Sequence, residues 1–369
     1  MTTAFLNAVI ITGEETIEGA ALLIEGDRII AIKEPSHLPP DINIIDCHGH
    51  YIAPGLIDLQ IAGSGGFLFS ETPTAEALRT IAGSIVMTGT TGFLIAIPTN
   101  TFAVYNEAAA VIRDNPLPSV LGLHLEGPYL NIKRRGAHFL SCIKKPDRDE
   151  IDQLMKDLGG VVRMMTVAPE LCDREIIECL NGHNVVVAAG HSNATYNEAT
   201  RGFMWGIRTT THLFNAMSQL HHRDPGLPGA TFMNGNVMAS IIADGIHVDY
   251  TMVSIAKKIM NDRLFLVSDA VEESSQPTNP HIRRKDRFTL PDGTLSGSAL
   301  TMLTAVRNCV EKTGISLDEA IRMASLYPAR LMNLHDRGKI KPGMRADLVS
   351  FDKDFNVSTV VLNGEILTN

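Results

Sequence analysis

Short apolar runs rich in β-branched residues alternate with longer amphipathic stretches through the middle of the chain. Stretches such as 74–89 and 173–183 carry apolar residues at helical spacing. Continuous apolar runs fit parallel strands that are buried on both faces. Eight strand-then-helix units predict an α/β fold, a (β/α)8 TIM barrel, rather than the competing doubly wound sheet. The eight runs occupy residues 55–63, 90–98, 119–128, 161–170, 184–192, 207–217, 237–248 and 263–271.

The two ends of the chain follow another pattern. Residues 1–52 and 346–369 consist of short strands separated by turn residues, which is typical of antiparallel β-structure. Two such segments at opposite ends predict one small, discontinuous β-sandwich domain. The barrel is then expected to occupy residues 53–345.

Composition narrows the class of protein. The chain has 369 residues, of which 44% are hydrophobic and 20% charged, an ordinary globular balance. A net charge of −9 argues against a nucleic-acid partner. We expect no membrane association, because no apolar run reaches the roughly 20 residues that span a bilayer. The first residues lack the features of a signal peptide, so a cytoplasmic location is expected. Five cysteines without a C-x-x-C pair predict neither a disulfide framework nor a cysteine zinc knuckle.

Three local motifs are interpreted as structural. The basic runs at 132–135 and 281–287 are the two cationic clusters of the sequence, and the second is expected to be a solvated loop. The glycine-rich segment 62–66 is expected to be a tight turn between a strand and a helix, although such loops can also bind phosphate. The pair His48 and His50 is not expected to bind metal, because it precedes the first barrel strand.

Polar residues stand near the carboxyl ends of the predicted strands, where barrel enzymes place their chemistry. Glu126, His191 and His212 stand at the ends of three different predicted strands. Two imidazoles and one carboxylate suit a catalytic zinc ion, which takes about three protein ligands and leaves a position open. Asp269 ends the eighth run and could move protons during hydrolysis. These residues predict a metal-dependent hydrolase.

Several sequence blocks carry a resemblance to a known family. They include LGLHLEGPYL (121–130), GAH (136–138), AGHSNAT (189–195), TTTHLFNAM (209–217), HHRDPG (221–226), ADGIHV (243–248), LVSDA (266–270) and GTLSGSALTM (293–302). With these blocks in this order, the chain resembles the amidohydrolase superfamily over nearly its whole length. Within it, the chain is most similar to the deacetylases of N-acetylglucosamine 6-phosphate.

The resemblance implies roles for individual residues. Glu126, His191 and His212 are expected to hold one divalent cation, Zn²⁺ by the family pattern, and Asp269 to be the catalytic acid–base. His138 is expected to steady the amide carbonyl oxygen. Family members are homodimers in which the equivalent of Arg223 reaches the neighbouring active site. The expected substrate contacts are Ala137, His138, Asn215, Ala216, Arg223, Asp244, Gly245, Ile246, His247, Leu295, Ser296 and Gly297.

One departure from the wider superfamily limits the number of metals. Many members carry His-x-His where this chain has Gln60 and Ala62. Alanine cannot bind a metal, so a single cation is expected. Three alternatives stay open: a deacetylase of N-acetylgalactosamine 6-phosphate, another one-metal amidohydrolase such as a deaminase, and a non-catalytic scaffold. The complete set of ligands together with Asp269 argues against the scaffold.

Overall fold

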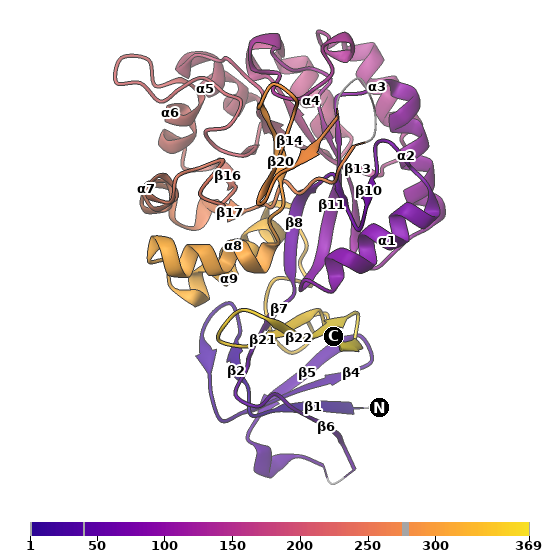
Figure 1. Ribbon diagram of the computed structural model, residues 1–369, viewed down its shortest axis with the longest axis vertical. Coiled ribbons are helices and arrows are strands. Elements are labelled where there is room, and N and C mark those ends of the chain that lie inside the picture. The colour runs from indigo at the N-terminus through magenta and orange to yellow at the C-terminus, as the bar shows by residue number, and fades with distance from the viewer. Residues whose placement is uncertain (1, 40, 275–279, 369) are drawn as a thin grey trace.

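A computed structural model of the chain describes residues 2–39, 41–274 and 280–368; the outer ends of the predicted small domain, residues 1 and 369, lie outside this part. Eight parallel strands form its centre, each pairing with the next along the sequence (Figure 1). The predicted barrel is thereby confirmed, and each strand lies within one of the predicted runs. The strands are β8 (Leu56–Ile61), β11 (Thr90–Pro98), β12 (Val120–Glu126), β13 (Val162–Val167), β14 (Val186–Ala189), β15 (Thr209–Thr210), β16 (Met238–Ile241) and β17 (Leu264–Leu266).

The barrel is closed where its first strand, β8, meets the segment that follows its last strand, β17. Ile61 and Ala270 form a parallel bridge there. Behind it, the buried carboxylate of Asp58 accepts hydrogen bonds from the backbone N–H groups of Gln60 at 3.1 Å and Ser268 at 3.2 Å. Burial raises the pKa of Asp58 to about 7. This carboxyl therefore ties the two edges of the barrel together.

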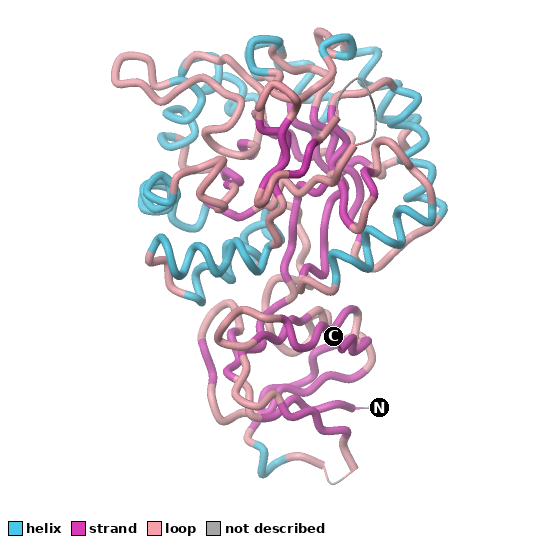
Figure 2. Tube along the Cα trace, viewed as in Figure 1, coloured by secondary structure: helices cyan, strands magenta, loops and turns pink. Residues whose placement is uncertain are grey.

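Helices surround the barrel (Figure 2). Several begin at a side chain that accepts a backbone N–H of the first turn, as Thr74, Thr101, Asp173 and Thr195 do. None of the described helices is long and apolar enough to cross a membrane, and the cytoplasmic location stays a prediction. The helices are α1 (Ala75–Val86), α2 (Phe102–Asp114), α3 (Arg148–Asp157), α4 (Arg174–Gly182), α5 (Tyr196–Trp205), α6 (Gly226–Met233), α7 (Tyr250–Met260), α8 (Met302–Asn308), α9 (Leu317–Ala324) and α10 (Leu326–Leu331).

A smaller β-unit lies beyond the amino-terminal end of the barrel (Figure 1). Phe5 and Ile24 of one sheet share a buried apolar cluster with Ile52 and Leu348 of the other, so the two sheets form a sandwich. Strand β21, from the C-terminal segment, pairs with β7, from the N-terminal segment. This pairing joins the two ends of the chain in one sheet. The domain boundaries themselves stay a prediction. One sheet holds β1 (Thr2–Leu6), β4 (Ala21–Glu25), β5 (Arg28–Lys33) and β6 (Asn43–Asp46); the other holds β2 (Val9–Ile11), β3 (Thr16–Ile17), β7 (Tyr51–Pro54), β21 (Leu348–Phe351), β22 (Val357–Leu362) and β23 (Glu365–Thr368).

Two inserted β-elements differ from the expectations. The segment 62–66 forms part of a hairpin of β9 (Gly63–Ser64) and β10 (Phe67–Leu68), not a direct turn into a helix. Gly65 and Gly66 make its turn with φ of +64° and +87°, values that favour glycine.

The basic run 281–287 is more ordered than the solvated loop that was expected. It contributes to a three-stranded sheet of β18 (Ile282–Arg283), β19 (Arg287–Thr289) and β20 (Leu295–Ser298). This sheet is joined to the barrel by a bridge between Ser298 and Ala270. The side chains of residues 283–286 are exposed, but strand pairing brings residue 281 to the barrel mouth.

Candidate metal centre and active-site cavity

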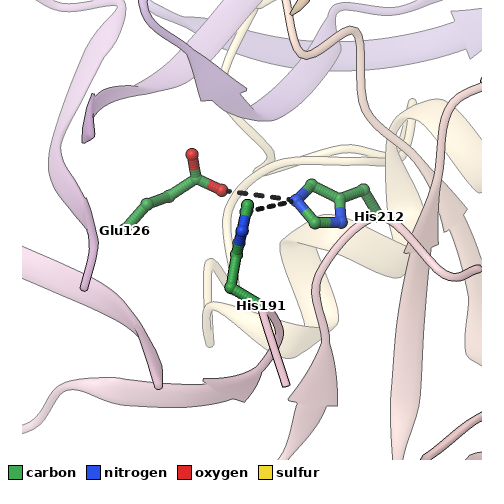
Figure 3. A group of neighbouring side chains, drawn as sticks. All are labelled: Glu126, His191 and His212. Carbon is green, nitrogen blue, oxygen red and sulfur yellow. Dashed lines mark hydrogen bonds and ion pairs between the residues drawn. The ribbon is translucent and has the colours of Figure 1, made fainter. Parts of the chain in front are cut away.

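Glu126, His191 and His212 meet at the carboxyl end of the barrel. Glu126 is the last residue of β12, and the two histidines follow β14 and β15 by two residues each. Their side chains point toward one another (Figure 3). Nε2 of His212 lies 3.0 Å from Nε2 of His191 and 3.7 Å from Oε1 of Glu126. One ligand atom of each residue lies within 4.8 Å of those of the other two, as a shared metal ion requires.

Backbone turns at the strand ends aim these side chains. His191, His212 and Asp269 have φ of +47°, +33° and +55°. Such left-handed conformations cost a non-glycine residue about 1 kcal/mol or more and concentrate at functional sites. Each of the three strands therefore stops shortly before a residue whose side chain turns into the barrel mouth.

Hydrogen bonds from the backbone assign the protons of two imidazoles. Nδ1 of His191 lies 3.0 Å from the carbonyl oxygen of Arg134, so Nδ1 carries the proton and Nε2 has a free lone pair. The backbone N–H of Thr99 donates to Nδ1 of His138 at 3.0 Å. His138 must then carry its proton on Nε2, which faces the centre 3.3 Å from His191. His191 is thus arranged as a ligand and His138 as a hydrogen-bond donor.

Burial controls the charges of the centre. It lowers the pKa of His138 to about 3, that of His212 to about 4, and that of His191 well below its ordinary value. It raises the pKa of Glu126 to about 8. The pKa of Asp269 is raised well above its usual range by burial and then by the charge of Glu126. Neutral imidazoles beside uncompensated carboxyls fit a divalent cation, whose charge would favour the ionised carboxylates.

Gln60 links the candidate ligand to the candidate acid–base. Its side-chain amide donates to Oε1 of Glu126 at 2.7 Å and to Oδ1 of Asp269 at 2.8 Å. Its Oε1 is buried without a partner among the described residues. Ala62, the second position of the family's His-x-His pair, lines the cavity with a methyl group.

The centre opens into a cavity of about 430 Å³. Most of the predicted site residues line it, including Asp269 and all three candidate ligands. Outside the lining lie Arg223, Asp244, Gly245 and Ile246, and His48 and His50 of the small β-unit. The predicted residues that line it are Glu126, Ala137, His138, His191, His212, Asn215, Ala216, His247, Asp269, Leu295, Ser296 and Gly297.

Asp244 lies behind His247 instead of in the cavity. Its Oδ2 lies 2.6 Å from Nδ1 of His247, and its Oδ1 accepts the backbone N–H groups of Ile246 and His247, both at 2.8 Å. Gly245 has φ of +73°, and a Cβ there would meet the ring of Tyr250 at 2.6 Å. The ADGIHV block therefore presents a single side chain, His247, to the cavity.

The cavity also contains two cationic side chains and one histidine, whose pKa is lowered by burial, that were not assigned to it from the sequence. Lys133, Arg134 and His281 line its wall. They come from the two basic runs noted in the sequence, and those runs were the signal that could have identified them. Arg134 is anchored by a 3.0 Å hydrogen bond to Asn193.

Comparisons with known proteins agree with this geometry. The amidohydrolase family model matches residues 51–367. An N-acetylglucosamine-6-phosphate deacetylase of Haemophilus influenzae is 34% identical, covering 98% of both chains. An N-acetylgalactosamine-6-phosphate deacetylase of Shewanella is also 34% identical, covering 86% of this chain and 83% of that protein. The chain therefore belongs to the amidohydrolase family, whose members are metal-dependent enzymes.

Solved structures extend the likeness to three dimensions. An N-acetylglucosamine-6-phosphate deacetylase of Pasteurella multocida is 34% identical and superimposes with a TM-score of 0.96 over 100% of both chains. A mutant deacetylase of Mycobacterium smegmatis, in complex with N-acetyl-D-glucosamine-6-phosphate, is 28% identical with a TM-score of 0.91 over 100% of this chain and 99% of that one.

Proposed function

We propose that the protein hydrolyses N-acetyl-D-glucosamine 6-phosphate to glucosamine 6-phosphate and acetate, in amino-sugar catabolism. The observation that carries this proposal is the convergence of Glu126, His191 and His212 beside Asp269 at the mouth of one cavity. The substrate is supported by the relatives, which share the fold over the whole chain and are named for this reaction.

Glu126, His191 and His212 would hold one divalent cation, which we propose to be Zn²⁺. Nitrogen and carboxylate ligands suit zinc better than magnesium or calcium. When bound, the cation would supply Lewis acidity, which makes water acidic enough to attack an amide near neutral pH.

In this proposal, Asp269 is the residue that transfers protons. Its carboxylate would take a proton from water as the oxygen adds to the acetyl carbon. It would return that proton to the sugar nitrogen as the C–N bond breaks, releasing acetate and the free amine. The Nε2–H of His138 would donate a hydrogen bond to the carbonyl oxygen as negative charge develops there.

The phosphate end of the substrate would bind to the wall formed by Asn215, Ala216 and His247. Burial alone lowers the pKa of His247, but the hydrogen bond and charge of Asp244 outweigh it, so the pKa is raised overall. A protonated His247 suits an anionic phosphate.

We also propose a homodimer in which Arg223 contacts substrate in the partner's cavity. Arg223 is exposed and lies outside its own cavity, which fits a role in a neighbouring subunit. Leu220 on the same loop, Met204 on α5 and Met233 on α6 are large, exposed apolar side chains. Contact between subunits would cover such surfaces.

A second candidate substrate is N-acetylgalactosamine 6-phosphate, because the Shewanella relative named for it is as identical as the Haemophilus one. The discriminating experiment measures free amine and acetate from both epimers with the zinc-loaded enzyme. A higher kcat/KM on the gluco epimer is expected. A preference for the galacto epimer would identify N-acetylgalactosamine 6-phosphate as the substrate instead. If the metal-loaded enzyme hydrolysed neither epimer, the proposed deacetylase function would be contradicted.

A further inference from the structure

A second group of metal-ligand side chains lies on the outside of the barrel. Asp152 belongs to α3, Cys179 to α4, and His183 is the C-cap residue that directly follows α4. Cys179 and His183 are four positions apart, the spacing that places two side chains on one face of a helix. The packing of α3 against α4 adds Asp152 to the same place.

The side chains of these three residues also converge. One ligand atom of each lies within 4.8 Å of those of the other two. Nε2 of His183 lies 2.8 Å from Oδ1 of Asp152. Ligands around a tetrahedral zinc ion are separated by roughly 3.3–3.9 Å, so small side-chain movements would suffice for coordination. Thiolate, imidazole and carboxylate are ligands that zinc accepts together.

The position of this group separates it from the active site. His183 precedes β14, whereas His191 follows it, so the two groups lie at opposite ends of the same strand. Asp152 and His183 keep 38% and 27% of their side chains exposed, which leaves room for an ion and a water ligand. His183 also lines a solvent-connected cavity of about 510 Å³.

Two neighbouring cations act on the site, Lys156 beside Asp152 and Arg148 beside Cys179. Lys156 contacts Oδ2 of Asp152 at 2.5 Å, but its side chain is 61% exposed and free to swing into solvent. Burial and the charge of Asp152 raise the pKa of Cys179, and together they outweigh the charge and hydrogen bond of Arg148 and the charge of Lys156, which lower it. Metal binding therefore has to displace a proton from the thiol and is favoured by mildly alkaline conditions.

We propose that Asp152, Cys179 and His183 bind a second divalent transition-metal ion, Zn²⁺ by ligand type, which links α3 to α4 independently of the catalytic centre. The remaining coordination position would be filled by water. The site requires neither the proposed substrate nor the proposed reaction.

Cobalt(II) provides a selective test, because a cobalt–thiolate bond gives an intense near-ultraviolet charge-transfer band and the catalytic centre contains no sulfur ligand. Metal-stripped full-length protein would be titrated with Co²⁺ at mildly alkaline pH. The band is expected in the wild type and in Glu126→Gln, which alters only the catalytic centre. It should vanish in Cys179→Ser and persist in the matched control Cys142→Ser, whose cysteine is also partly exposed.

Two further variants probe the other groups. Asp152→Asn should weaken cobalt binding by about tenfold or more, because it removes an anionic ligand. Lys156→Gln should tighten it by about two- to fivefold, because it removes the competing cation. Absence of the band from folded wild-type protein, or its persistence in Cys179→Ser, would overturn the proposal. Circular dichroism establishes that each variant is folded.

Discussion

The side-chain amide of Gln60 donates a 2.8 Å hydrogen bond to Oδ1 of Asp269, while its other N–H is directed to Glu126. One neutral side chain thus orients both carboxylates that the proposed reaction uses. Replacing Gln60 by leucine removes both hydrogen bonds at similar volume. We expect kcat to fall about 10- to 100-fold, as for other partners that orient metal ligands. Steady-state kinetics with metal analysis would measure this, and unchanged kcat in a metal-loaded Gln60→Leu variant would exclude the orienting role.

Asp269 is expected to be essential for turnover but not for metal retention. Asp269→Asn keeps the shape of the side chain and removes its capacity to accept a proton. We expect zinc content to be unchanged and kcat to fall by about 10²–10⁴-fold. Elemental analysis and the acetate-release assay would be run on one preparation. Wild-type turnover in that variant would rule out the proton-transfer role.

Substrate binding should weaken as pH rises through the pKa of His247. That pKa is raised, so the cationic form dominates below it and is lost above it. KM for the phosphorylated substrate is therefore expected to increase on the alkaline side. In Asp244→Asn the supporting charge is removed, and the increase should begin at lower pH. The pH profile of KM in both proteins tests this, and coincident profiles would show that Asp244 does not control the charge of His247.

Complementation between two inactive variants tests the role of Arg223 across the dimer. Arg223→Ala and Asp269→Asn are each expected to have little activity. In a mixed dimer, the site that retains Asp269 receives Arg223 from its partner and is complete. Random reassortment should restore roughly a quarter of wild-type activity, because half of the dimers are mixed and each has one complete site. No recovery after subunit exchange would place Arg223 outside the partner's site.

The strands of the barrel could be predicted because burial on both faces produces apolar runs that are independent of distant contacts. Glu126, His191 and His212 could be selected because the carboxyl ends of barrel strands face one mouth. The tautomers of His138 and His191 could not, since they depend on the backbone of Thr99 and Arg134, which only the folded chain supplies.

Some residues of the cavity wall lie in segments inserted between the predicted strand-then-helix units, and the sequence did not assign them to the site. Lys133 and His281 lie in segments whose charge is typical of solvated loops, and only packing on the barrel mouth brings them to the cavity. The left-handed backbone at His191, His212 and Asp269 left no signal in the sequence, because none of these residues prefers it as glycine does.

The closing seam of the barrel makes catalytic competence a sensitive reporter of local stability. The bridge from Ile61 to Ala270 and the hydrogen bond between the backbone N–H of Asp269 and the carbonyl of Gln60, at 3.1 Å, belong to the same few residues as the proposed proton-transfer apparatus. Fraying at this seam would misplace Asp269 while the other strand pairs and the surrounding helices stayed intact. On gradual heating, enzymatic activity is therefore expected to disappear before helical circular dichroism does. Inactivation would then be a local event at one edge of the barrel, distinct from denaturation of the whole chain.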